Sequence, residues 1–180
     1  MFVQTQTTPN PNSLKFLPGM TVSNSGTYEI TKKNNIENDL IRNILSINGV
    51  TGVFLGADFI SVNKEKIIKW EDVKHIVISL INDFYADGKE FVIDENIKEE
   101  VSDLSEIEEK IVKILEQKIR PAVARDGGDI KFKEFKNGVV KVQLQGSCSG
   151  CPSSTMTLKQ GVQNLLCHYL PEVKEVIAIQ

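Results

Sequence analysis

A seven-residue segment near the carboxyl end, Gly146-Ser147-Cys148-Ser149-Gly150-Cys151-Pro152, restricts the local fold more than any other part of this 180-residue chain. Proline is well tolerated at the first position of a helix, where its missing N–H has no partner to lose. Pro152 therefore predicts a helix start with Cys151 at or beside the N-cap. The two glycines give the loop enough backbone freedom to bring both sulfurs to one side. Two cysteines at this spacing can chelate one metal centre.

The segments around this loop predict an α-β-β-loop-α-β unit over residues 105–180. Its predicted elements are a helix over 105–119, strands over 130–135 and 139–144, a helix over 152–169 and a strand over 173–179. Asn137-Gly138 is typical of a tight hairpin turn. Arg120-Pro121 is expected to disturb the first helix, and Gly127-Gly128 to end it. The core stripe of the second helix is expected to be Leu158, Val162, Leu165 and Tyr169.

Residues 1–88 predict a separate small unit of strands and helices. Its predicted elements are strands over 14–17 and 27–30, a helix around 40–45, strands over 50–55 and 59–62, and a helix over 73–84. The buried face of that last helix is expected to hold Val73, Ile76, Val77, Leu80, Ile81 and Phe84. Residues 89–104 carry two basic and six acidic side chains and are expected to be an acidic linker. The fold class is therefore α+β with two small domains, 1–88 and 105–180.

The overall charge argues against two classes of partner. A formal net charge of -3 does not provide the concentrated basic surface that nucleic acid or an anionic membrane requires. No apolar run approaches the roughly 18 residues that span a bilayer, and the first 16 residues lack the layout of a secretory signal. We expect a cytoplasmic protein with no nucleic-acid or membrane partner, or a mitochondrial matrix protein if the chain is a trimmed mature form.

The chain has only three cysteines, an odd number that lies in its last fifth. This pattern favours metal or redox chemistry over a disulfide framework. Cys167 lies 16 residues beyond Cys151 on a predicted helix, about 24 Å away at about 1.5 Å per residue, and is expected to point away from the core. It is therefore not expected to join Cys148 and Cys151 on one metal. A symmetric dimer would supply four thiolates, and a cluster, a zinc ion and a redox-active or inert cysteine pair all stay open on the residues alone.

Other polar and aromatic residues are expected to have structural roles. They are surface His75 and His168, the anchor Trp70, the helix-end cations Arg120 and Arg125, the turn residues Asp126 and Asp129, and the ordered turn Pro9-Asn10-Pro11-Asn12.

Beyond these residue arguments, two parts of the chain resemble the NifU-like (Nfu-type) iron–sulfur scaffold family. Residues 146–179, with Arg120-Pro121 and Asp126-Gly127-Gly128-Asp129 upstream, resemble its carboxy-terminal domain, and Thr8-Pro9-Asn10-Pro11-Asn12-Ser13-Leu14-Lys15-Phe16 is similar to its amino-terminal domain. The resemblance covers nearly the whole chain.

This resemblance implies a non-catalytic scaffold and carrier. Cys148 and Cys151 of two chains would hold a [4Fe–4S] cluster, with [2Fe–2S] as the alternative form, in a cluster-bridged homodimer. The cluster would come from upstream assembly machinery and pass to apo iron–sulfur proteins. Cys167 matches no ligand position of the family. The alternative functions are a thioredoxin-like thiol–disulfide oxidoreductase and a zinc-bridged dimer.

Overall fold

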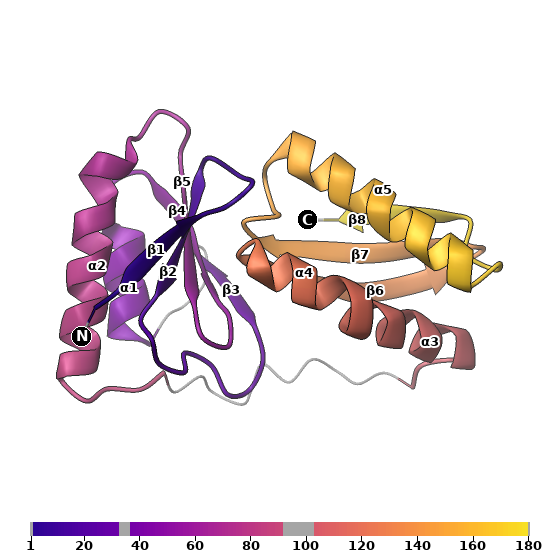
Figure 1. Ribbon diagram of the computed structural model, residues 1–180, viewed down its shortest axis with the longest axis horizontal. Helices are drawn as coiled ribbons and strands as arrows, with labels where there is room; N and C mark the ends of the chain where they lie inside the picture. The colour runs from indigo at the N-terminus through magenta and orange to yellow at the C-terminus, as the bar shows by residue number, and fades with distance from the viewer. Residues whose placement is uncertain (1, 33–36, 92–102, 180) are drawn as a thin grey trace. The chain divides into compact units, whose positions relative to one another are not determined.

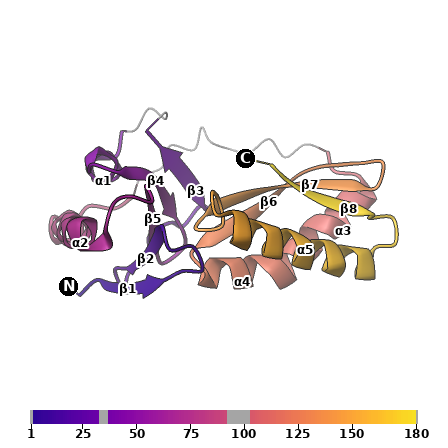
Figure 2. The same ribbon diagram turned by 90° about the horizontal axis from the view of Figure 1, so that it is seen from above.

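The structure, a computed structural model, describes residues 2–32, 37–91 and 103–179. The chain divides into two compact units, Met1–Val92 and Ile93–Gln180. Each unit is a β-sheet with helices packed on it (Figures 1 and 2), which confirms the predicted α+β class. Most of the predicted acidic linker lies outside the described residues. Among the described residues, no helix has both the length and the apolar character needed to cross a membrane.

The first unit is an antiparallel sheet of order β1-β2-β5-β4-β3 with two helices. Its elements are β1 Gln4–Thr7, β2 Ser13–Leu17, β3 Tyr28–Thr31, α1 Asp39–Ser46, β4 Val50–Leu55, β5 Ile60–Lys64 and α2 Trp70–Ala86. Both helices lie on the same side of the sheet (Figure 2). Their apolar faces and the sheet enclose the core of this unit.

Strand β1 was not predicted, because its sequence Gln-Thr-Gln-Thr carries no apolar alternation. It is an edge strand whose side chains are mostly exposed, and it pairs antiparallel with β2, with Thr5 opposite Phe16. Backbone pairing with β2, and not burial of its side chains, defines this edge strand, so the strand leaves no apolar pattern in the sequence.

The predicted turn before β2 is confirmed as an ordered structure. Asn10 is buried, and its side-chain carbonyl accepts a 2.9 Å hydrogen bond from the backbone N–H of Asn12. Trp70, the first residue of α2, donates from Nε1 to the carbonyl oxygen of Pro11 at 3.0 Å. Trp70 is thus an anchor between α2 and this turn, as predicted.

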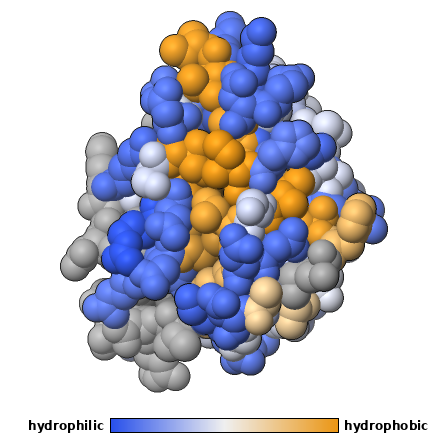
Figure 3. All heavy atoms as spheres, turned by 90° about the vertical axis from the view of Figure 1, so that its left-hand side faces the viewer, coloured by the Kyte–Doolittle hydropathy of each residue, from blue (hydrophilic) through white to orange (hydrophobic). Residues whose placement is uncertain are grey.

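The buried face of α2 is narrower than predicted. Val73, Val77 and Ile81 are almost fully buried, but Ile76 is 46% exposed. At about 100° per residue, Ile76 lies about 100° from Val77 and so falls at the edge of the buried stripe. Figure 3 shows apolar side chains reaching the surface on this side of the first unit.

The second unit has a three-stranded sheet of order β6-β7-β8. Its elements are α3 Glu106–Ile114, the π-helical turn η2 Leu115–Ile119, α4 Arg120–Arg125, β6 Gly128–Lys136, β7 Val139–Gly146, α5 Pro152–Tyr169 and β8 Glu175–Ile179. Strands β6 and β7 form the predicted hairpin, with positive φ at Asn137 (51°) and Gly138 (79°) as a type I′ turn requires. Strand β8 returns parallel to β7 after α5.

The first helical segment of this unit is interrupted where Arg120-Pro121 predicted a disturbance. Pro121 has no N–H to donate to the preceding turn, and its ring crowds that turn. The chain widens into η2 immediately before this point and resumes as α4. A π turn of this kind accommodates the proline without ending the helical path.

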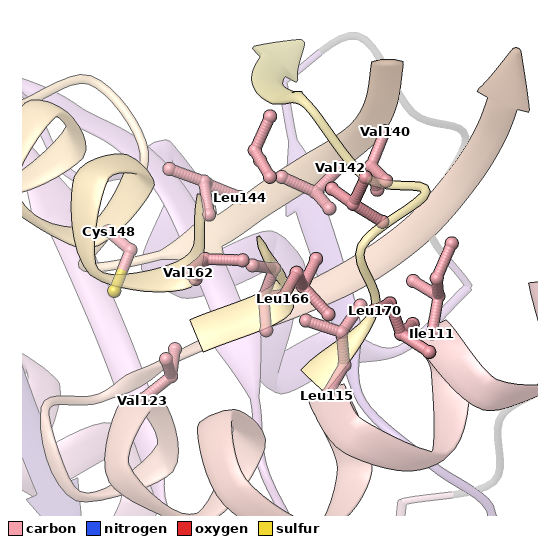
Figure 4. Close-up of a cluster of buried hydrophobic side chains, with 13 residues drawn as sticks. Ile111, Leu115, Val123, Val140, Val142, Leu144, Cys148, Val162, Leu166 and Leu170 are labelled. Atoms are coloured by element: carbon pink, nitrogen blue, oxygen red, sulfur yellow. The ribbon is translucent and has the colours of Figure 1, made fainter. Parts of the chain in front are cut away.

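The core of the second unit lies between the sheet and its helices (Figure 4). Val162 and Leu166 of α5 are fully buried, whereas Leu165 is half-buried and Tyr169 exposed. The predicted core stripe of α5 was therefore wrong beyond Val162. Cys167 is half-buried and packs against the core, so the prediction that it points away from the core was also wrong.

Candidate functional site

The Cys-x-x-Cys loop joins the end of β7 to the start of α5. Gly146 (φ 68°) and Gly150 (φ 76°) both have the left-handed backbone that glycine adopts without strain. The N–H of Ser149 donates to the Gly146 carbonyl oxygen at 3.2 Å, which closes a turn around the first cysteine. Cys151 is the N-cap residue of α5 and Pro152 its first residue, as predicted.

Cys148 is buried, with only 7% of its surface exposed. It lies at one end of the core cluster (Figure 4), so this part of the loop belongs to the core of the second unit. Burial is the largest cause that raises the pKa of the Cys148 thiol, to about 11, and the nearby carboxylates of Asp126 and Asp129 raise it further. The Cys148 side chain is therefore a neutral thiol at pH 7.

Cys151 has the opposite environment. Its Sγ lies 3.4 Å from the hydroxyl of Ser153 at the open start of α5. Hydrogen bonds from the hydroxyls of Ser153 and Ser154, followed by the backbone N–H of Ser154, lower the pKa of the Cys151 thiol to about 7. This lowered pKa favours the thiolate at neutral pH, the form that binds metal and attacks disulfides.

Hydroxyl groups on both sides hold the Cys148 backbone in place. The Ser147 N–H donates to the Gly127 carbonyl oxygen at 3.2 Å, and the Ser147 hydroxyl donates to the carbonyl of Asp126. From α5, the Thr155 hydroxyl donates to the Cys148 carbonyl oxygen at 3.0 Å. Sequence reasoning missed Ser147 and Thr155, whose only signal was their closeness to the two cysteines.

The Gly127-Gly128 pair supports the loop from the turn between α4 and β6. Gly127 has φ 84°, a conformation that L side chains rarely adopt. A Cβ on Gly128 would lie 2.5 Å from the Gln145 carbonyl oxygen and 2.9 Å from Cys148 Sγ. The absence of a side chain at 128 is therefore what lets Cys148 pack against β6.

Asp129 is more than the turn residue that was expected. Its buried carboxylate accepts two hydrogen bonds from the Arg120 guanidinium, at 2.9 and 2.8 Å, and one from the Ile130 N–H at 2.8 Å. Arg120 is thus a partner of this carboxylate and not a solvated helix-end cation. The pair ties α4 to the start of β6, at the residue directly after Gly128, which packs against Cys148.

Only two of the predicted candidates, Cys148 and Cys151, come together in one loop. His75 and His168 are exposed on other elements, as predicted. In the three described ranges of the chain, no group of three or more His, Cys, Asp or Glu side chains could hold a metal ion. The loop therefore offers two soft sulfur donors from one chain, with a buried thiol beside a half-buried, readily ionised one.

The domain content of the chain identifies its class. Residues 3–88 match the family described as scaffold protein Nfu/NifU N terminal, and residues 111–177 match the NifU-like domain. The chain belongs to the Nfu-type family of NifU-like proteins. The Cys-x-x-Cys loop lies within the second matched region.

Curated relatives support this membership over nearly the full chain. The protein named NFU1 iron-sulfur cluster scaffold homolog, mitochondrial, of Drosophila erecta is 44% identical over 98% of this chain, and that of Drosophila sechellia is 45% identical over the same share. The chain spans 64% of the length of each of these relatives. Among solved structures, a NifU-like protein from Saccharomyces cerevisiae is 28% identical, with a TM-score of 0.49 over 53% of this chain and 87% of its own.

Proposed function

We propose that this protein is an iron–sulfur cluster scaffold and carrier, in which Cys148 and Cys151 of two chains bind one [4Fe–4S] cluster that is then passed to apo-proteins. The observation that carries the proposal is the pair of thiols in one loop at the start of α5. Thiolate sulfur is the usual protein ligand of iron in such clusters, and four are usual. The names of the curated relatives support the scaffold role.

The two-ligand loop favours a site shared between copies. One chain supplies two of the usual four ligands. A two-fold axis near the loop would bring in the same two cysteines of a second chain and complete the set. A [2Fe–2S] cluster has the same ligand number, so iron and sulfide analysis distinguishes the two forms.

Burial gives the two cysteines different roles in loading. Cys151 is accessible at the helix start and is the first ligand to meet incoming iron. Cys148 is packed against Gly128, so its sulfur has to turn out of the core before it binds. The Cys148 thiol would release its proton to solvent on binding, and the free energy of iron–thiolate coordination would offset the cost of ionising and moving this group.

The same arrangement favours release of the cargo. Cluster transfer exchanges these thiolates for those of an acceptor, and the Cys148 thiol regains its proton and its packing in the core as it leaves. The scaffold would thus retain the cluster less strongly than an acceptor that buries four preorganised thiolates.

A thiol–disulfide oxidoreductase is the second candidate, because one cysteine of the pair lies half-buried at a helix start with a lowered pKa and the other is buried. Element order argues against it. A helical segment and a hairpin precede the loop here, where a thioredoxin-like enzyme has a βαβ unit.

Anaerobic reconstitution with iron and sulfide tests the proposal. The wild-type chain is expected to gain broad visible absorption, and Cys148→Ser and Cys151→Ser to lose it. Cys167→Ser is the matched control, because it removes the third thiol without touching the loop, and it is expected to load fully. A Cys148→Ser protein with a full cluster would defeat the ligand assignment, and disulfide reduction by the wild type without any cluster uptake would favour the second candidate.

A further inference from the structure

The outer face of α5 is uncharged beside the cysteine loop. Met156 is 72% exposed, although it is a large apolar side chain. The other exposed residues between the start of α5 and Leu166 are Pro152, Ser153, Thr157, Gln160, Gly161 and Asn164. None of them is ionisable, and Lys159, the only charged residue among 152–166, is half-buried.

Helix α3 of the same unit has, by contrast, a charged exposed face. The exposed residues of α3 include Glu106, Glu109, Lys110 and Lys113, and Glu106 and Lys110 form an ion pair at 2.7 Å. The solvent face of a helix carries charged or polar residues, and the α5 face differs from that of α3 in having polar residues without charges. Two features of this face, the lack of charge and the exposed methionine, are shared with the central part of protein interfaces.

We propose that this face of α5, which includes Met156, is the surface on which a second copy of the chain docks, an inference that rests on the shared-cluster function proposed above. A cluster held by two loops brings two α5 starts together, and Met156 lies five residues beyond Cys151, about 7.5 Å along the helix axis. In a two-fold dimer, residues near the axis face their own counterparts. An uncharged face can meet its own copy without like-charge repulsion, whereas α3 would place Glu against Glu or Lys against Lys.

Charge substitution at Met156 tests this surface in the full chain loaded anaerobically with iron and sulfide. Met156→Glu and Met156→Lys each place two like charges across the axis, and each is expected to raise the dissociation constant of the loaded dimer about tenfold or more. An equimolar mixture of the two variants places Glu against Lys, so it is expected to form mixed dimers with a dissociation constant close to that of wild type. Sedimentation analysis gives the constants, and a mass tag on one variant identifies the mixed dimers.

The matched control is Ile67→Glu. Ile67 is 82% exposed in the first unit, where apolar side chains also reach the surface (Figure 3), and this substitution is expected to leave the loaded dimer unchanged. Unchanged far-UV spectra of the Met156 variants exclude unfolding as the cause, and recovery in the mixture excludes it independently.

Three outcomes separate this inference from the function on which it rests. A wild-type chain that loads as a monomer defeats the shared-cluster function itself. A wild-type loaded dimer that both Met156 variants match defeats only the proposed surface. Variants that dimerise normally but deliver the cluster slowly to an apo acceptor assign the face to the acceptor and overturn the assignment to a second copy.

Discussion

Gly128→Ala probes the contact that seats Cys148 against the sheet. The added Cβ would lie 2.5 Å from the Gln145 carbonyl oxygen, a backbone atom of the strand paired with β6. Relief requires the hairpin to shift at its first pair, Gly128 and Gly146. Such overpacking costs about 1–3 kcal/mol, and the less flexible unfolded chain returns about 0.4–1 kcal/mol. We expect a net loss of about 1–2 kcal/mol in the free energy of unfolding.

Urea unfolding followed by two probes measures this loss in the full chain. Trp70 is the only tryptophan and lies in the first unit, so its fluorescence reports that unit, whereas far-UV circular dichroism reports both. The substitution is expected to shift the dichroism transition and not the fluorescence transition. Because the Cβ also lies 2.9 Å from Cys148 Sγ, Cys148 should become more reactive toward alkylating reagents.

The control for Gly128→Ala is Gly161→Ala. A Cβ at 161 meets no heavy atom within 4 Å, and alanine within a helix is favoured over glycine by about 0.5–1 kcal/mol. This variant should therefore be more stable than wild type in the metal-free form. The steric argument fails if Gly128→Ala is as stable as wild type and its Cys148 is no more reactive.

Alkylation with mass-spectrometric mapping at neutral pH should label Cys151 well before Cys148, and the Cys151 rate should rise through pH about 7. Burial raises the folded pKa of Cys148 to about 11, so its contribution to stability is complete below the unfolded value of about 8.5 and is lost as pH rises toward 11. Cys148→Ala should lack this alkaline loss in urea titrations. Arg120→Ala leaves the buried Asp129 carboxylate without its guanidinium partner. Breaking a fully buried pair costs about 3–5 kcal/mol, and because Arg120 is 34% exposed we expect the free energy of unfolding, measured in urea, to fall by about 2–3 kcal/mol. Cys167→Ser should keep the cluster in reconstitution and cost about 1 kcal/mol, because a half-buried sulfur is replaced by a hydroxyl.

Control measurements define what would contradict these predictions. Lys110→Ala removes an exposed ion pair that water screens, so it should leave the free energy of unfolding almost unchanged. An Arg120→Ala protein as stable as the Lys110→Ala protein would contradict the importance of the buried pair. Equal labelling rates for the two loop cysteines would contradict the asymmetry of the site.

Local rules were sufficient where the backbone itself dictates the structure. Asn137-Gly138 formed the predicted hairpin because both residues tolerate positive φ. Pro152 began α5 with Cys151 at the N-cap because proline fits best in the first turn of a helix. The position of the cysteine loop followed from these two features.

Tertiary contacts decided what the sequence could not predict. Cys148 is buried because residues twenty positions earlier, at the glycine turn, leave room for its sulfur. Asp129 became the partner of Arg120 because the π turn places α4 beside β6. The core stripe of α5 followed Leu166 and not Leu165, since a small rotation of a helix against its sheet changes which of two adjacent leucines is buried.

The central claim is that one cluster is shared by the loops of two chains. Multi-angle light scattering on the anaerobically loaded protein, with iron, sulfide and protein measured on the same fractions, tests it most directly. We expect a dimer with about four irons and four sulfides per two chains, which weakens to monomers when a chelator strips the iron, because cluster binding stabilises the dimer by mass action. A loaded monomer, or a dimer of unchanged strength after the iron is removed, would contradict the shared site.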